Sequence, residues 1–522
     1  MLSNLQCRIP VGVLVLLILR FTCNNLYAQN MPAITSSHYG GIYSAQLNPA
    51  ATVLSPLYLD INIVAADLFV ENNYIFMPRE ENKLQRFFNS DRPFVNSGPD
   101  KTYADYYTNS LKYGQMQARV TGPSVSLVAG RHAFGISTAV RSVTSVRDMP
   151  HTLAKFFYEG LYFPPQYDTR FVYPNKVSVA SLQWAEVGLT YSTVISSNGK
   201  DLFTGGATVK RLLGYAAAYI DMDHLDYMVP NYDTLIIYNA DIDAGFSLPL
   251  DYKSNDYLPD THVRGKGMGL DAGFMWERKL KVPTDARYFR KLCGQSYIPY
   301  LFRVGVSLLD FGSIRFTENA RQLGVVNGQL FWPGISDLEY TNLHDLSQQV
   351  SMHFYGDEES LVRARDFSIG LPATVSLQGD FNLTAFITGR SAENLAGTVK
   401  RHASGSGFMG RLWEPGNWFV NGIVMLPVNR TTASAVQPTM LMIGTRYESP
   451  HFQLGVTGSF YDNKYFHLGL NGRFRFFFVG TDNLLSFLKV SDYTGTSLYA
   501  GVRIGLRKGN CRELGFKCPD LF

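Results

Sequence analysis

Arginines recur at alternate positions near the end of the chain, together with one glutamate and one histidine. The set comprises Arg446, Glu448, His467, Arg473, Arg475, Arg503 and Arg507. Side chains on a β-strand point to opposite faces with a period of two, so alternate residues share a face. Basic groups on the inner wall of a narrow lumen would attract anionic solutes or a lipid carboxylate. In the alternative interpretation, the same arginines pair with acidic groups of a plug or of facing strands, and this lattice stiffens the wall.

Three runs of alternating apolar and polar residues position most of this set. They are residues 439–448, 452–461 and 465–476. In the second run Leu454, Val456 and Phe460 share one face, and the turns at 449–451 and 462–464 make the runs neighbouring antiparallel strands. The apolar face meets a second sheet in a soluble sandwich, whereas in a membrane barrel it meets lipid and the polar face lines the lumen.

The composition favours an all-β protein with many turns. The 522 residues include 31 tyrosines, 35 phenylalanines and 46 glycines, while charged residues make up only 17%. A secreted β-sandwich would share this composition, so composition alone does not choose the barrel. The net charge of +4 is close to balance for this length and gives no indication of nucleic-acid binding.

Residues 1–28 have the features of a secretory signal peptide. Arg8 precedes an apolar stretch, and the tripeptide Leu26-Tyr27-Ala28 ends in a small residue, so cleavage is expected after Ala28. Arg20 interrupts the stretch, and no later segment offers about 18 uncharged apolar residues for a membrane helix. An exported chain without such a helix spans a membrane only as a closed barrel, so the outer membrane is the expected location.

Cleavage would leave three cysteines, and their number excludes a disulfide scaffold. They are Cys293, Cys511 and Cys518. Cys511 and Cys518 are close enough in sequence to pair in an oxidising compartment. No metal-ligand spacing accompanies them. Alternating aspartates such as Asp221, Asp223 and Asp241 suggest either a calcium site or a solvated polar face, and the absence of a glycine-centred calcium loop favours the latter. No cofactor is expected.

Fourteen strands are predicted for the wall of the barrel. They are residues 57–69, 117–129, 133–143, 184–195, 202–213, 266–279, 298–309, 364–378, 381–389, 417–426, 439–448, 452–461, 465–476 and 497–507. Residues 216–245 form either two further strands, which gives sixteen, or a loop. Both counts are even, as single-chain bacterial barrels require. The chain then divides into a signal peptide (1–28), an N-terminal plug (29–56), the barrel (57–507) and a short periplasmic tail (508–522).

The predicted connections differ in length between the two ends of this barrel. With both termini in the periplasm, long excursions fall outside, at residues 70–115, 144–183, 246–264, 310–363 and 390–416. Tight turns fall inside, at 130–132, 196–201, 379–380 and 462–464. Short periplasmic turns and long external loops are the asymmetry of bacterial barrels. The connections 280–297 and 449–451 fit this assignment less well.

Several motifs resemble a known group of barrels. Asn48-Pro49-Ala50 resembles the N-terminal hatch of the long-chain fatty-acid transporter (FadL) superfamily and its PorV-like relatives. Residues 265–273 (GKGMGLDAG), 305–312 (GVSLLDFG) and 480–485 (GTDNLL) resemble an uncharacterised family of outer-membrane barrels of this superfamily, found in Bacteroidetes. The resemblance implies a monomeric barrel of about fourteen strands in which Asn48, Pro49 and Ala50 belong to the plug or hatch.

Enzyme signatures are few, so the chain is expected not to be an enzyme. Ser406 lies between two glycines but lacks the Gly-x-Ser-x-Gly elbow of hydrolases. The glycine-rich run at 265–269 begins a strand and does not link a strand to a helix, which argues against nucleotide binding. His467 near Ser459 or Asn471 is a weak catalytic candidate, and a hydrogen-bonded lumen histidine is the alternative.

Two functions follow as hypotheses. The first is a FadL-like transporter or channel in contact with outer-membrane lipid, which carries small or hydrophobic molecules and is gated by the N-terminal segment. The second is a scaffold barrel that holds an outer-membrane or periplasmic protein partner, as PorV-like relatives do in type IX secretion. Neither hypothesis involves nucleic acid.

Overall fold

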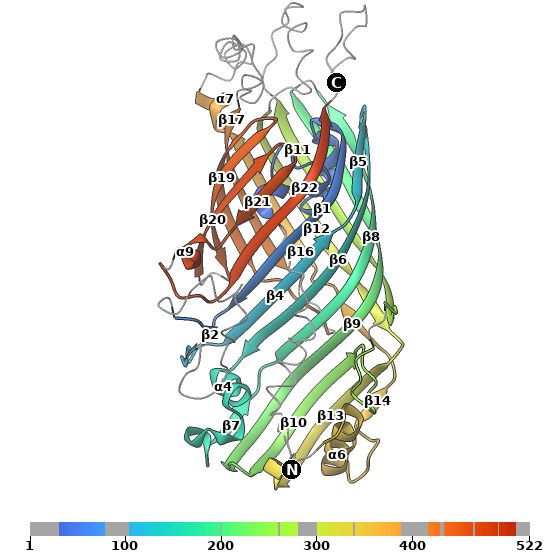
Figure 1. Ribbon diagram of the computed structural model, residues 1–522, viewed down its shortest axis with the longest axis vertical. Coiled ribbons are helices and arrows are strands. Elements are labelled where there is room, and N and C mark those ends of the chain that lie inside the picture. Colours follow the sequence, from blue (N-terminus) through green and yellow to red (C-terminus); the bar gives the residue numbers. More distant parts are fainter. Residues whose placement is uncertain are drawn as a thin grey trace, which may run out of the picture.

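A closed β-barrel contains nearly all of the described chain in the computed structural model (Figure 1). The structure describes residues 31–78, 104–198, 200–258, 261–279, 300–337, 340–387, 416–428, 433–462, 465–488 and 490–507. Twenty strand segments form one sheet, and antiparallel pairing of the last, β22, with the first, β1, closes the ring. Closure leaves no free sheet edge, so the backbone polar groups of the wall bond to neighbouring strands.

The strand segments follow one another around the ring with few breaks in chain order. They are β1 (Leu57–Asn72), β4 (Lys112–Thr121), β5 (Ser124–Ala129), β6 (His132–Met149), β7 (Arg170–Tyr173), β8 (Val177–Ser197), β9 (Asp201–Asn231), β10 (Thr234–Ser247), β11 (Gly265–Lys279), β12 (Tyr300–Phe316), β13 (Ala320–Pro333), β14 (Val362–Ala364), β15 (Phe367–Gly370), β16 (Thr374–Asn382), β17 (Asn417–Pro427), β18 (Met440–Glu448), β19 (Phe452–Tyr461), β20 (Tyr465–Phe474), β21 (Phe477–Thr481) and β22 (Thr496–Arg507). A separate two-stranded sheet pairs β2 (Ile75–Phe76) with β3 (Ala104–Asp105).

The helices are short and lie inside the barrel or at its ends. They are α2 (Pro32–Thr35), α4 (His151–Glu159), α6 (Leu343–Tyr355), α7 (Leu383–Ile387) and α9 (Leu484–Phe487), with 3-10 turns η1 (Gly41–Gln46), η2 (Pro49–Leu54), η3 (Gly160–Tyr162), η4 (Pro164–Gln166) and η5 (Ile335–Asp337). Among the described residues, the structure contains no helix that is both long enough and apolar enough to cross a membrane.

Several segments continue one another end to end, so the wall has fourteen strands. β4 continues into β5, β7 into β8, β10 into β11, β12 into β13, and β14 through β15 into β16, because each group pairs with the same neighbour in one direction. The predicted fold, a closed antiparallel barrel of about fourteen strands, is confirmed.

The wall has its apolar face outside and its polar face inside, which excludes a soluble sandwich. On β19, Leu454 and Val456 are 49% and 42% exposed, whereas the alternating Gln453 and Thr457 are 0% and 3% exposed. Water outside would favour the opposite arrangement, since burial of apolar surface drives folding in water. The exposed apolar face therefore suits lipid.

The two ends of the barrel differ in extent. We call the end where β1 begins and β22 ends proximal, and the opposite end distal. β9 has 31 residues, far more than the roughly 9–11 that cross a bilayer. Together with β10 and β13 it extends the wall beyond the other strands at the distal end, where α4 and α6 lie (Figure 1). Apolar side chains such as Leu153, Tyr227 and Leu361 form a cluster at this end.

One predicted strand does not exist and one strand of the structure was not predicted, so the total of fourteen is unchanged. Residues 381–389 are not a separate strand, because Phe381 and Asn382 end β16 and α7 follows directly. β21 is missing from the prediction, because the aromatic run from 474 to 478 contains no obvious turn residue. The chain nevertheless reverses at Arg475, whose φ of 49° is left-handed.

The stretch 216–245 belongs to the wall, so a third assignment replaces the two predicted alternatives. Residues up to Asn231 continue β9, and β10 and β11 lie in line beside it. The stretch therefore lengthens two strands and adds none. Residues 248–264 leave the wall between β10 and β11, so the predicted excursion at 246–264 does not join two neighbouring strands at an external end.

The false strand also reverses the ends assigned to three connections, and a fourth predicted turn does not exist. The connection containing 390–416 starts at the proximal end, where β16 ends, and the turn at 462–464 is distal. No turn exists at 379–380, since Gly379 pairs with Gly422 within the wall. The turn at 449–451 is proximal, where its shortness fits the predicted asymmetry.

The outward apolar face predicts a specific sensitivity to charge. Ile443 lies in the middle of β18 and is 61% exposed. If this face contacts lipid, Ile443→Lys should lower the free energy of unfolding in bilayers by about 2–4 kcal/mol. Chemical denaturation in lipid vesicles measures the change, with Ile443→Phe as the apolar control. Equal stability of both variants would contradict a lipid-facing wall.

Candidate functional site

Residues 31–55 lie inside the barrel, in the half nearer the proximal end (Figure 1). Met31, Ile34, Tyr43 and Thr52 are fully buried, which requires the wall to surround them. Three groups of wall side chains pack against the segment: Ala65, Phe478 and Tyr499 at its start, a methionine-rich group around Leu47, and Val194, Leu202 and Met275 at its end. We call residues 31–55 the enclosed segment.

Asn48 and Pro49 start the 3-10 turn η2 and attach the enclosed segment to the wall. Asn48 caps η2, since its Oδ1 accepts a hydrogen bond from Ala50 N at 3.0 Å, and Pro49 occupies the first helical position. The Asn48 amide group donates to Gln378 Oε1 at 2.9 Å and to the carbonyl of Phe274 at 3.2 Å. One amide thus caps the segment and joins it to the wall.

Glycines of the wall provide the space for this contact. A Cβ at Gly206 would lie 2.6 Å from the carbonyl carbon of Pro49, and one at Gly305 would lie 2.8 Å from Asn48 Nδ2. A Cβ at Gly273 would overlap Asn48 Oδ1. Gly273 and Gly305 belong to the sequence motifs 265–273 and 305–312. These motifs and the Asn-Pro-Ala motif therefore meet in space, which their positions in the sequence did not indicate.

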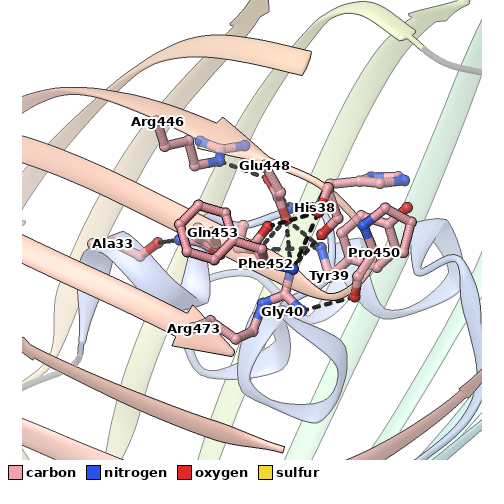
Figure 2. A network of polar contacts seen from close by, with 12 residues as sticks. Ala33, His38, Tyr39, Gly40, Arg446, Glu448, Pro450, Phe452, Gln453 and Arg473 are labelled. Carbon is pink, nitrogen blue, oxygen red and sulfur yellow. Dashed lines mark hydrogen bonds and ion pairs between the residues drawn. The ribbon is translucent and has the colours of Figure 1, made fainter. Parts of the chain in front are cut away.

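Glu448 anchors the beginning of the enclosed segment (Figure 2). Its buried carboxylate accepts hydrogen bonds from the Ser37 hydroxyl, from His38 N at 3.3 Å and from Tyr39 N at 2.9 Å. Arg446 Nε donates to the same carboxylate at 2.8 Å, and Arg473 Nη2 lies 4.0 Å from it. Since a buried charge is costly unless paired, the two arginines make this anchor stable.

Arg503 and Asp60 form a second anchor a few residues further along. Arg503 donates to the carbonyl of Gly40 at 2.6 Å and to that of Tyr39, while Asp60 Oδ2 accepts from Ile42 N at 2.8 Å. Arg503 and Asp60 are 3.7 Å apart. Gly41 has a φ of 58°, a left-handed value that favours glycine, and a Cβ there would overlap the Asp60 carboxylate.

The structure distributes the predicted lumen arginines differently. Arg446, Arg473 and Arg503 are buried and lie around the start of the enclosed segment. Arg475 lies in the turn between β20 and β21, and Arg507 ends β22, with its side chain outside the described set. Arg446 bonds to Glu448 on its own strand and to Asp380 on β16, whereas Arg473 and Arg503 donate to backbone carbonyls. Their proposed attraction for anionic solutes stays a prediction.

A further cluster of buried charges crosses the lumen on the side of β6 to β12. Arg141 donates two hydrogen bonds to Asp310, each of 2.8 Å, and Lys210 Nζ lies 2.7 Å from both Asp271 and Asp310. Sequence reasoning missed this cluster. The available signal was an acidic residue at an inward position of an otherwise apolar run, as at Asp271 and Asp310.

The weak catalytic and metal candidates do not assemble a recognisable centre. Ser459 and His467 are neighbours across β19 and β20, but Ser459 Oγ has no hydrogen-bond partner among the described residues. His467 Nε2 lies 3.3 Å from Glu71. Within the described ranges, no group of three or more histidine, cysteine or acidic side chains is placed to hold a metal ion. Cys293, Cys511, Cys518 and the predicted signal peptide lie outside the described residues.

The contact between η2 and Gly206 predicts a steric lock. Gly206→Ala should push η2 from the wall at a cost of about 1–3 kcal/mol, the usual range for overpacking. Hydrogen exchange of the amides at 50–54 should then be at least about tenfold faster. Gly379→Ala is the control, since a Cβ there meets nothing within 4 Å. Unchanged exchange in Gly206→Ala would refute the lock.

His38, in the enclosed segment, predicts a pH dependence of docking. Burial lowers the pKa of its imidazole well below the usual 6.5, and the charge of Arg303 lowers it further. Below pH 6.5 an undocked segment takes up a proton that the docked segment resists, so docking should weaken by up to about tenfold per pH unit. The protection factors of the segment amides, which are exchange rates corrected for the intrinsic rate at each pH, test this between pH 7 and 5. His38→Asn should remove the dependence, whereas the exposed His132→Asn should keep it.

Comparison with known proteins places the chain in a family but assigns no activity. No curated protein matches it. Among solved structures, the Pseudomonas putida toluene transporter TodX shares 10% identity over 90% of this chain and 95% of its own, with a TM-score of 0.36. A Pseudomonas aeruginosa FadL homologue shares 10% identity over 88% and 92%, with a TM-score of 0.26. The Escherichia coli outer-membrane protease OmpT shares 6% over 87% and 98%, with a TM-score of 0.22.

These TM-scores are too low to support a fold assignment. The barrel fold is therefore established by the strand pairing described above. The model of the family of unknown function DUF5723 matches residues 49–482, which is most of the chain. That range begins at Pro49, includes the motifs 265–273 and 305–312, and ends within the motif 480–485. The chain therefore belongs to the family of unknown function DUF5723.

Proposed function

We propose that this protein is an outer-membrane barrel that passes small hydrophobic or amphipathic molecules and that the enclosed segment closes its proximal end. The outward apolar face supports the location, because side chains such as Ile443 and Phe460 are exposed on the outer wall. The proposal assigns no catalytic activity to the chain.

A seam of buried polar groups distal to the anchors of the enclosed segment is the observation that carries the transport function. Both carboxylate oxygens of Asp67 and the hydroxyl of Tyr499 are buried, with no hydrogen-bond partner among the described residues. Asp67 and Tyr499 are direct neighbours across β1 and β22. Buried polar groups require partners, so we infer that water reaches this part of the lumen. A wet lumen behind a closing segment suits passage better than a purely structural core does.

The wall beside this seam supports hydrophobic or amphipathic cargo. Met425, Met440 and Met442 pack with Leu47 and Phe69 in one apolar cluster. Methionine is flexible and adapts to apolar partners of different shapes. On β1, Phe69 lies between the inward Asp67 and Glu71, so apolar and polar groups line the same stretch.

The attachment of the enclosed segment supports displacement. Glu448 and Arg503 hold it through backbone N–H and carbonyl groups, which water can replace. The ring closes by pairing of β1 with β22, and no residue of the segment takes part in that pairing.

Weakening the two anchors should open the barrel. The double variant Glu448→Gln, Arg503→Gln should raise single-channel conductance in planar bilayers and uptake of a hydrophobic fluorophore into liposomes, each at least about tenfold. Deletion of residues 29–56 should raise both further. Asp366→Asn, Arg315→Gln is the matched control, because it removes an exposed ion pair of the wall.

Silence of all variants would overturn the transport proposal, provided that circular dichroism shows folded barrels. That outcome would favour the second candidate, a scaffold for protein partners. Its support is the ordered distal end, where α4 and α6 lie and where Tyr162 and Tyr232 stack with ring centroids 6.0 Å apart while both are exposed. Crosslinking from these two positions in intact outer membranes would then identify the partner.

A further inference from the structure

Three basic side chains lie together on the outer face of the wall, on the neighbouring strands β9, β11 and β12. They are Arg211, Lys266 and Arg315, and all three are exposed. Lys266 and Arg315 are direct partners across β11 and β12. Arg211 is opposite Met268, which is the outward residue of β11 next to Lys266. Since opposite side chains on one face of a sheet are about 5 Å apart at Cβ and diagonal ones lie within about 8 Å, the three charges form one cluster. We call these three residues the basic trio.

The outward face of β11 shows where the basic trio lies relative to lipid. From Trp276 to Met268 its outward side chains are apolar, and Lys266 is the next one. Near the proximal end, the ring of Trp276 contacts those of Phe203 and Phe302, and aromatic rings gather at the interfaces of membrane barrels. Trp276 and Lys266 are ten positions apart, and roughly 9–11 residues of a tilted strand cross a bilayer. The basic trio therefore lies at the level of the distal headgroups.

The positive charge of the basic trio is balanced only in part. Arg315 donates to one carboxylate oxygen of Asp366, from Nη2 at 2.6 Å and from Nε at 2.9 Å. Among the described residues, neither Arg211 nor Lys266 has an ionic or hydrogen-bond partner. Like charges that face each other across a sheet repel, as Lys266 and Arg315 do here. The cluster therefore requires a negative charge that the described chain does not supply.

The proximal end of β11 differs in this respect. Arg278 lies two positions proximal to Trp276, and its guanidinium is 3.6 Å from the carboxylate of Asp201. Trp276 Nε1 donates to the same carboxylate at 3.0 Å. At the proximal headgroup level the wall thus provides its own acidic partner, whereas at the distal level of the same strand it leaves Lys266 unpaired.

We propose that the basic trio binds the phosphate group of an anionic membrane lipid in the distal leaflet. Arginine and lysine are the side chains that proteins use for phosphate, and their long stems lie along apolar surface while the charged ends reach the headgroups. Met268 and Phe311 are 59% and 47% exposed beside the trio, where they would contact the acyl chains of the same lipid. The inference rests on the outer-membrane location proposed above, and it does not depend on transport or on the enclosed segment.

Native mass spectrometry of the mature chain in detergent tests the site, with dioleoyl phosphatidylglycerol and dioleoyl phosphatidylcholine as probes. The anionic lipid should bind at least about tenfold more tightly than the zwitterionic lipid, because the basic side chains attract net negative headgroups. The double variant Arg211→Gln, Lys266→Gln should lose this preference, whereas Lys266→Arg should keep it. Arg131→Gln, Lys200→Gln is the charge-matched control, since it removes two exposed basic groups from the proximal turns, and it should also keep the preference.

Equal affinity of the unaltered chain for both lipids would overturn the site. So would a preference that survives in Arg211→Gln, Lys266→Gln, provided that circular dichroism shows a folded barrel, or an equal loss of preference in the control variant. Displacement of the anionic lipid by inorganic phosphate at a similar concentration would assign the site to the free ion and overturn the lipid.

Reconstitution into phosphatidylcholine vesicles separates this site from the proposed location. A chain that inserts into these vesicles but shows no preference for the anionic lipid keeps the outer-membrane location and loses the site. A chain that does not insert loses the location and the site together. Since no transport is measured, the conductance and uptake experiments remain an independent test of the transport function.

Discussion

The pairing of β1 with β22 is the constraint on which the rest of the structure depends. It joins the two ends of the described barrel in twelve residue pairs and converts an open sheet into a ring. Once the ring is closed, the inward face no longer meets bulk solvent, and each polar side chain on it needs a partner or a trapped water. The anchors at Glu448 and Arg503 and the cluster at Asp310 are two solutions to this requirement.

Much of the fold follows from the sequence because alternation is a local property. The three runs between 439 and 476 alternate clearly, and the structure forms β18, β19 and β20 there, although β20 ends at Phe474. The failures occur where local signals mislead. Alternation continues from β16 into α7, and the reversal at Arg475 contains none of the usual turn residues. The long β9 appears as two elements because it passes two successive neighbours, β11 and β10. Such a feature depends on partners that a single strand does not reveal.

The candidate site was harder to predict from the sequence, because its contacts join residues that are far apart in the chain. Asn48-Pro49-Ala50 stood out through resemblance to known hatches, but its seat against Gly206 and Gly273 depends on how the ring closes. The sequence left open whether the arginines attract anions or pair with acidic groups. In the structure, Glu448 lies two residues from Arg446 on the same face and accepts its hydrogen bond. Charge pairing inside a low-dielectric lumen is a property of the assembled wall.

The enclosed segment is joined to the wall by a very short connection. η2 ends at Leu54 and β1 begins at Leu57, so only Ser55 and Pro56 separate them. The segment is therefore a tethered ligand of its own barrel, at an effective concentration on the order of millimolar for a short flexible link. It cannot be diluted away, and its return does not depend on protein concentration. A soluble competitor of equal affinity would lose to it at micromolar levels.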